Sequence, residues 1–202
     1  MILTPQAIAI LSAVSTATIT TILLKKGLRN VWMRGPKPLR SNLPRIVGRA
    51  FTLRFVPARE DLATPESWAS PRSTRGAIEA MPEGCIAVVD AMGITDAGIF
   101  GDILCARMKQ RNVAALVTDG VVRDVAGVLG TGLPVWCAGT ASPPSVAGLT
   151  YVNDDDAGLT RVAGKSGFSY RDAEGRPVTD AQTLERIKTL VIPPAWTDVW
   201  IC

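Results

Sequence analysis

The chain of 202 residues contains no histidine. This absence excludes a serine–histidine or cysteine–histidine nucleophile pair, a histidine general base, and any zinc site that needs imidazole ligands. Aromatic residues make up only 5% of the chain, but apolar residues make up 47% and charged residues 20%. That balance supports a folded core and argues against wholesale disorder. The length suits one ordinary domain, or one domain and a fragment.

Acidic residues are missing from the first part of the chain. No Asp or Glu occurs before Glu60, while ten Lys and Arg residues fall between Lys25 and Arg59. A basic segment of this kind could attract nucleic acid or an anionic substrate. A solvated surface is the more common role of such charges, so no nucleic-acid partner is expected from them.

Cysteine is scarce and forms no pattern. The four cysteines show no metal-ligand spacing and no pairing, and three of them, Cys85, Cys105 and Cys137, lie in apolar runs. We expect these three to be buried thiols in a reducing compartment.

Residues 1–24 carry no charge, but Ser and Thr between 12 and 21 interrupt the run and no signal-peptide features accompany it. We therefore expect soluble helices, no membrane partner and a cytoplasmic protein.

The spacing of apolar residues predicts alternating strands and helices. Thr4-Pro5 opens one helix, and a second helix covers about 15–26. Later strands are expected at 46–57, 85–91, 113–118 and 134–139, helices at 77–81, at 101–111 and from about 125, and loops at 92–100 and 119–124. Strand–helix–strand units of this length predict parallel pairing with right-handed crossovers. The fold class expected from periodicity is α/β.

Three charged residues stand where this pattern brings loops together. Asp102 begins a predicted helix, and Arg123 and Asp124 lie in the loop after the next strand, with twenty residues between Asp102 and Arg123. A helix of about three turns runs down the sheet and a strand of about six residues returns. Both loops should therefore open at the carboxyl ends of the strands, where α/β sheets place ligands.

These residue types suit a small keto acid held beside a hard cation. Mg²⁺ binds one or two carboxylates and keeps several waters, and on a keto oxygen it would stabilise an enolate. Arg123 could hold a substrate carboxylate through two parallel hydrogen bonds, and free N–H groups at 101–104 could add donors. Each residue also has a structural alternative. Asp102 could complement the helix dipole, Asp124 could cap a helix, and Arg123 could be solvated.

Residues 97–139, AGIFGDILCARMKQRNVAALVTDGVVRDVAGVLGTGLPVWCAG, resemble the central motif of the RraA-like family, the fold family of the metal-dependent 4-hydroxy-4-methyl-2-oxoglutarate aldolases. In that family an Asp, a gap of twenty residues and an Arg-Asp pair define the aldolases. Residues 14–30, 45–62 and 82–93 are similar to the family as well, so the resemblance covers residues 1 to about 148.

The resemblance implies a fold, an activity and a set of roles. The fold would be an α/β/β domain of the swivelling type that lacks its C-terminal strands, because the family continues past 134–139 with further strands. The activity would be retro-aldol cleavage to pyruvate, often with oxaloacetate decarboxylation, in trimers or hexamers with sites at subunit interfaces. Substrate would be bound by Gly101, Asp102, Ile103, Leu104 and Arg123.

In the same resemblance Asp124 would ligate Mg²⁺ or Mn²⁺, and Asp102 would help to hold or polarise a water on that metal, so that Asp102 and Arg123 are the catalytic candidates. One departure concerns the residue three positions after Asp124. An acidic residue is usual there, but this chain has Gly127.

Residues 149–202 are similar to a different family, the type IB DNA topoisomerases of bacteria, at their N-terminal segment. The most specific string is IPPAWTDVWI at 192–201. We expect a small α+β fragment with a hairpin around 173–175, a helix capped by Thr179 with Leu184, Ile187 and Leu190 on one face, and a final strand at 197–202. The catalytic tyrosine of that family lies beyond the segment, so no topoisomerase activity is expected. An RraA-like domain with an unusual C-terminal subdomain is the alternative.

The sequence thus predicts two parts, 1–148 and 149–202, and three candidate functions. The first is a divalent-metal lyase acting on a pyruvoyl-type keto acid, impaired by the loss of the C-terminal strands. The second is a protein that binds and regulates a ribonuclease without catalysis, although such members tend to lack the full Asp and Arg-Asp set. The third is a DNA-binding fragment, which only the tail suggests. The presence of Asp102 favours the enzyme.

Overall fold

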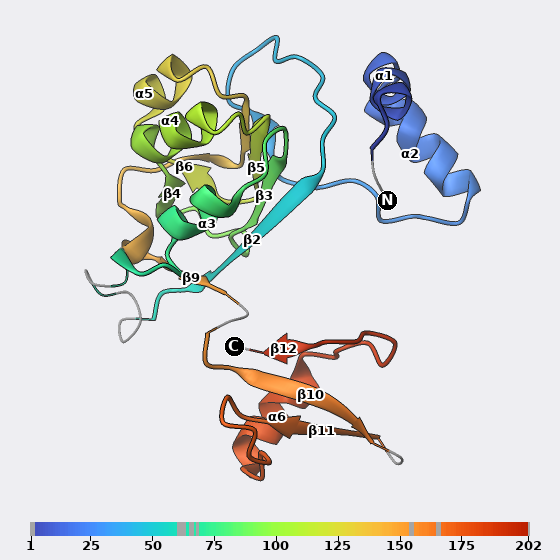
Figure 1. The fold of residues 1–202 in the computed structure, drawn as a ribbon, viewed down its shortest axis with the longest axis vertical. Helices are drawn as coiled ribbons and strands as arrows, with labels where there is room; N and C mark the ends of the chain where they lie inside the picture. The colour runs from blue at the N-terminus through green and yellow to red at the C-terminus, as the bar shows by residue number, and fades with distance from the viewer. Residues whose placement is uncertain are drawn as a thin grey trace. The chain divides into compact units, whose positions relative to one another are not determined.

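A computed structural model describes residues 3–59, 64, 67, 69–153, 156–164 and 167–201. The chain divides into two compact units, Met1–Tyr151 and Val152–Cys202 (Figure 1). The elements up to this boundary are α1 (Pro5–Ala13), α2 (Thr16–Lys25), β1 (Lys37–Pro38), β2 (Ala50–Pro57), α3 (Thr74–Ala80), β3 (Ile86–Asp90), β4 (Gly98–Phe100), α4 (Asp102–Gln110), β5 (Ala115–Thr118), β6 (Val121–Val122), α5 (Val125–Gly130), β7 (Val135–Cys137), β8 (Gly139–Thr140), η2 (Ser145–Ala147) and β9 (Leu149–Val152). The second unit contains β10 (Leu159–Gly164), β11 (Gly167–Arg171), α6 (Ala181–Thr189) and β12 (Trp200–Ile201). The domain boundary expected at 148 and 149 stays a prediction.

A six-stranded mixed sheet forms the centre of the first unit. Its strand order is β1-β7-β5-β3-β2-β9, of which β5, β3 and β2 are labelled as neighbours in Figure 1. The four strands β2, β3, β5 and β7 pair in parallel, and β1 is antiparallel to β7. Three of the four residues of β5 are buried, as expected of a strand covered on both faces. The α/β class and the parallel pairing expected from the sequence are confirmed.

A second sheet of three short parallel strands has the order β4-β6-β8. The loops predicted at 92–100 and 119–124 are therefore wrong in part, because each segment contains one of these strands. Runs of two or three residues are too short for a strand pattern to be recognised in the sequence. All residues of β4 and β6 are buried, so the short strands belong to the core.

One continuous hydrophobic core joins the two sheets. Phe55 of β2 packs edge-on against Phe100 of β4, with ring centroids 6.3 Å apart. Figure 1 shows α4 and α5 together beside the short strands, and α4 contacts both α3 and α5. Cys85, Cys105 and Cys137 are buried free thiols, as the sequence predicts, while Cys202 lies outside the described residues.

The two N-terminal helices start where the sequence predicts. The Thr4 hydroxyl accepts a hydrogen bond from the Ala7 N–H ahead of Pro5, and Ser15 does the same for Thr18 in α2. Neither helix contains a buried residue. In the part of the chain that the structure describes, no single helix could span a membrane by length and composition. The pair α1 and α2 passes that test only together, across a bend of 106°.

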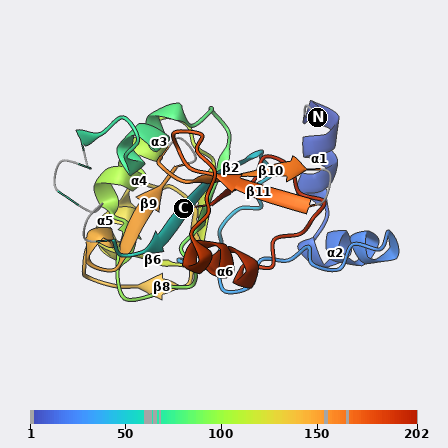
Figure 2. The same cartoon turned by 90° about the horizontal axis from the view of Figure 1, so that it is seen from below.

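The second unit is a small antiparallel sheet of order β11-β10-β12, with α6 beside it (Figures 1 and 2). The expected hairpin is present, since the Asp172 N–H donates to the Arg176 carbonyl around the turn. The expected final strand is present as β12, although Cys202 lies outside the described residues. The predicted cap is wrong. Asp180, and not Thr179, accepts the hydrogen bond from Thr183, because α6 begins at Ala181 and Asp180 therefore occupies the N-cap position.

The apolar face predicted for this helix is narrower than expected. Ile187 is buried and Leu184 is half-buried, but Leu190 is 51% exposed and stands at the end of α6. The small sheet therefore receives little more than one large side chain from the helix.

Candidate functional site

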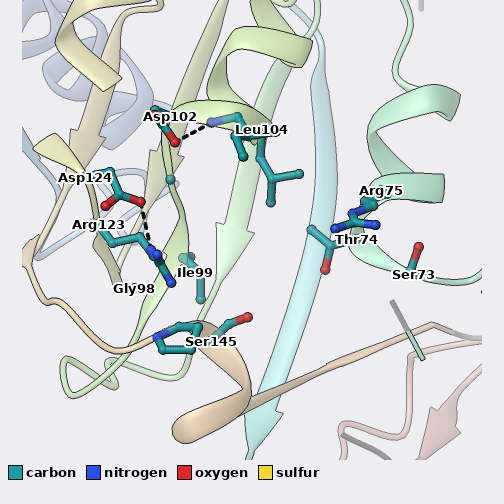
Figure 3. A pocket seen from close by; sticks show the side chains of 13 residues that line it. Ser73, Thr74, Arg75, Gly98, Ile99, Asp102, Leu104, Arg123, Asp124 and Ser145 are labelled. Carbon is teal, nitrogen blue, oxygen red and sulfur yellow. Dashed lines mark hydrogen bonds and ion pairs between the residues drawn. The ribbon is translucent and has the colours of Figure 1, made fainter. Parts of the chain in front are cut away.

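A cavity of about 380 Å³ opens in the first unit beside β4, α4 and the loop after β6 (Figure 3). It brings together all of the site residues predicted from the sequence, which are Gly101, Asp102, Ile103, Leu104, Arg123 and Asp124. The other residues that line it are Ser73, Thr74, Arg75, Gly98, Ile99, Pro144 and Ser145. Of the predicted residues, Ile103 is the most open to solvent, with 78% of its surface exposed.

The parallel pairing of β4 with β6 places the charged residues together. Gly98 pairs with Val121 and Phe100 with Val122, and the Arg123 N–H donates to the Phe100 carbonyl at 3.0 Å. β4 ends just before Gly101 and Asp102, and β6 ends just before Arg123 and Asp124. The shared edge predicted from the sequence exists, but it belongs to the three-stranded sheet and not to the strands at 85–91 and 113–118. The sequence pattern did not reveal β4 and β6, which is why the edge was expected on the larger sheet.

Two glycines allow this close approach of the backbones. A Cβ at Gly98 would lie 2.8 Å from the Cβ of Arg123, and a Cβ at Gly101 would lie 2.7 Å from Oδ2 of Asp124. Contacts this short do not occur between real side-chain carbons and their neighbours. Any other residue at Gly101 would push Asp124 away from the first turn of α4.

Asp102 is the first residue of α4 and is half-buried in the cavity wall. Its Oδ1 accepts a hydrogen bond from the Ile103 N–H at 2.7 Å. Gly101 precedes it at the N-cap and supplies no side-chain cap. A carboxylate here complements the helix dipole. The structural role considered for Asp102 is thus present, and Oδ2 accepts no hydrogen bond from the described residues.

Asp124 occupies the N-cap position of α5, but its side chain makes no capping hydrogen bond. Its backbone is left-handed, with φ 53° and ψ 48°, a conformation that costs a non-glycine residue about 1–3 kcal/mol. Its Oδ2 instead accepts a hydrogen bond from Nε of Arg123 at 2.8 Å. The side chains of Arg123 and Asp124 are 35% and 45% exposed, so this pair is half open to the cavity.

The wall opposite Arg123 comes from the start of α3, which the sequence analysis did not connect with the site (Figure 3). Ser73 caps α3 by accepting from the Gly76 N–H at 3.3 Å, and Thr74 and Arg75 follow it. No spacing relates these residues to Asp102. A run of four polar residues at 72–75, before a predicted helix, is the only sequence feature that distinguishes them.

An ion-pair cluster ties the two walls together. Glu79 of α3 accepts hydrogen bonds from Nε and Nη2 of Arg107 in α4 at 2.6 and 2.8 Å, and from Arg111 at 3.3 Å. The hydrogen bond from Arg107 lowers the pKa of Glu79 below its ordinary value, and the charges of both arginines act in the same direction. The pairs are exposed, so their contribution to stability is modest. Their consequence is geometric, because they hold α3 against α4.

The carboxylates of Asp102 and Asp124 are the available metal ligands of this cavity. Within the described residues, no group of three or more His, Cys, Asp or Glu side chains could hold a metal ion. Zinc sites need three or four such ligands, whereas Mg²⁺ is held by one or two carboxylates and several waters. Two half-exposed carboxylates in a water-accessible cavity fit Mg²⁺ or Mn²⁺.

Comparison with known families matches two parts of the chain to two different families. Residues 16–155 match the RraA-like family, described as Aldolase/RraA, and residues 167–202 match the N-terminal domain of bacterial DNA topoisomerase IB. The chain therefore carries a topoisomerase IB N-terminal segment behind the RraA-like part. The resemblance of each part that the sequence suggested is confirmed.

Curated relatives match the first part of the chain. A protein of Halalkalibacterium halodurans named "Putative 4-hydroxy-4-methyl-2-oxoglutarate aldolase" is 32% identical over 104 residues, which are 52% of this chain and 44% of that protein. Protein DlpA of Legionella pneumophila is 31% identical over 103 residues, which are 51% of this chain and 16% of DlpA. The chain thus spans less than half of the length of these relatives.

Solved structures match over most of the chain. The crystal structure of Streptomyces coelicolor RraAS2, described as an unusual member of the RNase ES inhibitor RraA protein family, is 28% identical with a TM-score of 0.63, over 93% of this chain and 91% of that one. A protein of Pseudomonas syringae pv. tomato shares the fold, with a TM-score of 0.60 and 18% identity over 93% of this chain and 88% of that one. With the mixed α/β sheet and the match of residues 16–155, these findings show that the chain belongs to the RraA-like aldolase family.

Proposed function

We propose that the first unit is a divalent-metal-dependent lyase of the aldolase or oxaloacetate decarboxylase type, acting on pyruvoyl-type keto acids with Mg²⁺ or Mn²⁺. The observation that supports this most strongly is the meeting of Asp102, Arg123 and Asp124 in one cavity. Family membership alone does not support enzymatic activity, because the family includes proteins described as ribonuclease inhibitors.

Each residue has a role that its surroundings allow. Asp124 would ligate the metal, because its side chain is not consumed by capping α5. Asp102 would hold a water and accept or return a proton through Oδ2, since Oδ1 is occupied by the Ile103 N–H. When bound, the divalent cation supplies positive charge where negative charge develops on the keto oxygen.

Arg123 would hold the substrate carboxylate. Its Nε is bound to Asp124, which orients the guanidinium, and its two terminal nitrogens have no hydrogen-bond partner among the described residues. A planar guanidinium offers two parallel donors to a carboxylate, which lysine does not. The N–H groups of Gly101 and Leu104 at the start of α4 would add donors for the same anion, while the Ile103 N–H is already bonded to Asp102.

The finer architecture and assembly are also proposals. The two sheets of the first unit are consistent with a swivelling-type α/β/β domain in which, among the described residues of that unit, only the short strands β8 and β9 follow β7. A homo-trimer or hexamer with sites at subunit interfaces would cover apolar side chains that α1 and α2 now expose, among them Ile10 and Leu24. The cytoplasmic location expected from the sequence remains a prediction.

Binding of a ribonuclease is the alternative function. It is supported by the 28% identity with RraAS2, whose description places it among inhibitors of RNase ES. DNA binding by the second unit is a weaker alternative, supported by the match of residues 167–202. Neither alternative function requires Asp102 and Asp124 to act together. Substitution of these carboxylates should therefore abolish lyase activity but leave the binding of a ribonuclease or of DNA unchanged.

The test is Mg²⁺-dependent release of pyruvate from oxaloacetate by the full chain. We expect activity above the rate of Mg²⁺ alone, loss of that activity with EDTA, and a strong effect of Arg123→Ala. Removing the guanidinium leaves a substrate carboxylate unpaired, at a cost of roughly 2–5 kcal/mol in a desolvated site. Arg72→Ala is the matched control, because Arg72 is exposed and does not line the cavity. Activity unchanged by both EDTA and Arg123→Ala would refute the proposal.

A further inference from the structure

Two neighbouring strands of the large sheet are followed by two neighbouring strands of the small sheet. β3 pairs with β5 in parallel, and β4, which follows β3, pairs in parallel with β6, which follows β5 (Figure 1). The chain therefore crosses between the sheets twice, first through residues 91–97 and again through residues 119–120. Asp102 comes after the first crossing and Arg123 after the second, so the geometry of the site depends on how the two crossings are joined.

The carboxylate of Asp119 joins the two crossings. Its Oδ1 accepts a hydrogen bond from the Ala91 N–H at 2.7 Å, and its Oδ2 accepts one from the Gly93 N–H at 2.8 Å. These donors precede Asp119 by 28 and 26 residues, so the carboxylate acts between the crossings and not within one of them. Asp119 is half-buried and does not line the cavity of the candidate site.

The segment that Asp119 holds is a turn with an unfavourable backbone. Met92 and Gly93 both have positive φ, 55° and 68°, and the Ile94 N–H donates to the Ala91 carbonyl at 3.1 Å. A left-handed residue with a side chain persists only where its surroundings hold it. The N–H groups of such a turn form a concave site for an anion. In this chain the anion is the Asp119 carboxylate.

Asp90 holds the same turn from within the first crossing. Its Oδ1 accepts a hydrogen bond from the Met92 N–H at 2.8 Å, and its Oδ2 lies 3.5 Å from Nε of Arg54. Asp90 is the last residue of β3, so its bond to Met92 is local. Of the two carboxylates that stabilise the turn, that of Asp119 is the one that binds it to the second crossing.

The two crossings and the strands after them are in close contact. A Cβ at Gly120 would lie 2.6 Å from the Cβ of Ala91, and a Cβ at Gly98 would lie 2.8 Å from the Cβ of Arg123. The backbones thus touch both at the start of the crossings and at the site itself. A displacement of residues 91–93 is therefore passed to β4 and to the start of α4.

We propose that Asp119 is a positioning residue, which sets the place of Asp102 relative to Arg123 and Asp124 by holding the first crossing against the second. This inference rests on the function proposed above and adds a residue that does not line the cavity. Without the carboxylate the unfavourable turn relaxes, which moves Asp102 and leaves Asp124 in place. A shift of about 1 Å in a reacting group lowers a rate by as much as about 100-fold.

The test compares Asp119→Ala with Asp90→Ala in the full chain. Each variant removes one carboxylate from the same turn, so both should lower the midpoint of thermal unfolding. With Mg²⁺ and oxaloacetate, Asp119→Ala should lower kcat about tenfold or more, whereas Asp90→Ala should change it less than about twofold. Asp119→Asn keeps one acceptor oxygen and should lie between the native chain and Asp119→Ala. If Asp119→Ala does not fold, Asp119→Asn and Asp90→Asn make the same comparison.

Amide hydrogen exchange measured without metal or substrate gives a readout that does not depend on activity. The Arg123 N–H, bonded to the Phe100 carbonyl at 3.0 Å, joins the end of β6 to the end of β4. We expect its exchange to be about tenfold faster or more in Asp119→Ala and nearly unchanged in Asp90→Ala. Equal exchange of this amide in the two variants would overturn the inference.

Mn²⁺ affinity separates a shift of Asp102 from collapse of the whole site. It should change less than about twofold in Asp119→Ala, because Asp124 keeps its place. If kcat stays at the native value in Asp119→Ala, falls equally in Asp90→Ala, or falls in parallel with Mn²⁺ affinity, the inference is wrong and the proposed function stands. If the native chain releases no pyruvate, the proposed function is wrong, and a positioning role in it is wrong as well.

Discussion

The side chain of Asp102 lies directly against the backbone of Gly127. A Cβ added at Gly127 would come within 2.6 Å of the Asp102 Cβ and 2.9 Å of its Oδ2. This is the position at which an acidic residue is usual in the family that the sequence resembles. In this chain the glycine at position 127 of α5 has no side chain, so Asp102 packs against that helix and still lines the cavity.

Gly127→Ala should damage the site even though it improves helix propensity. Alanine is favoured over glycine by about 1 kcal/mol within a helix, but overpacking costs about 1–3 kcal/mol. We expect Asp102 to be displaced and kcat/KM for oxaloacetate to fall about tenfold or more. Steady-state kinetics and thermal unfolding measure the two effects.

Gly130→Ala is the matched control on the same helix. A Cβ at Gly130 would meet nothing within 4 Å. This variant should keep full activity and gain up to about 1 kcal/mol of stability. Equal activity of the two variants would show that the contact between Gly127 and Asp102 does not position the carboxylate.

The described cysteines should be inert in the folded chain. Burial raises the pKa of Cys105 to about 12 from its ordinary value of 9.0, and the charges of Asp102 and Cys137 act in the same direction. Burial also raises the pKa of Cys85 and of Cys137. Because the thiolate is the reactive form, iodoacetamide at pH 8 should leave these three peptides unmodified in the native chain and alkylate them in denaturant. Rapid alkylation of the Cys105 peptide under native conditions would contradict the packing of α4.

The same burial gives stability a dependence on pH. Below pH 9.0 the Cys105 thiol is protonated in both the folded and the unfolded chain. Its raised pKa therefore does not change the free energy of unfolding in that range. As the pH rises from 9.0 toward about 12, the unfolded chain loses the Cys105 proton and the folded chain keeps it. The free energy of unfolding should therefore fall across this window. Cys105→Ala should reduce the fall in urea titrations at pH 8 and pH 10.5, whereas an unchanged slope would contradict this assignment.

The two compact units should unfold independently. Ile187 is 2% exposed and is the principal apolar anchor of α6 in the second unit. Ile187→Ala should cost about 2–5 kcal/mol, more than a unit of fifty residues can readily lose. We expect hydrogen exchange in the full chain to accelerate across β10, β11 and α6 and to stay unchanged in β3 and β5. Faster exchange in β3 and β5 would show that the units form one cooperative structure.

Long, periodic segments made the main architecture predictable. The apolar run that forms β3 and the capped start of α2 each carry a local signal that tertiary packing reinforces. The charged pair at Arg123 and Asp124 could also be found, because it lies in the loop after the strand predicted at 113–118, and polar residues that follow a buried strand gather at one sheet edge.

The rest of the site depends on contacts that leave no periodic signal. β4 and β6 are strands of three and two residues, so their pairing and the edge they create were not visible in the sequence. Arg75 lines the cavity from α3, which Glu79 joins to α4 through a contact that spans 28 residues of sequence. The helix cap of α6 was misplaced by one residue, since Thr179 and Asp180 are both good caps and only geometry distinguishes them.

The most direct test of the account is Mn²⁺ binding measured by electron paramagnetic resonance on the full chain without substrate. The account predicts one bound Mn²⁺ per chain, displaced by Mg²⁺, and an affinity that falls at least tenfold in Asp124→Asn, because a ligating carboxylate is lost. Asp96→Asn removes an exposed carboxylate that does not line the cavity and should leave the affinity unchanged. Equal Mn²⁺ affinity in the native chain and in both variants would contradict a metal site at Asp124.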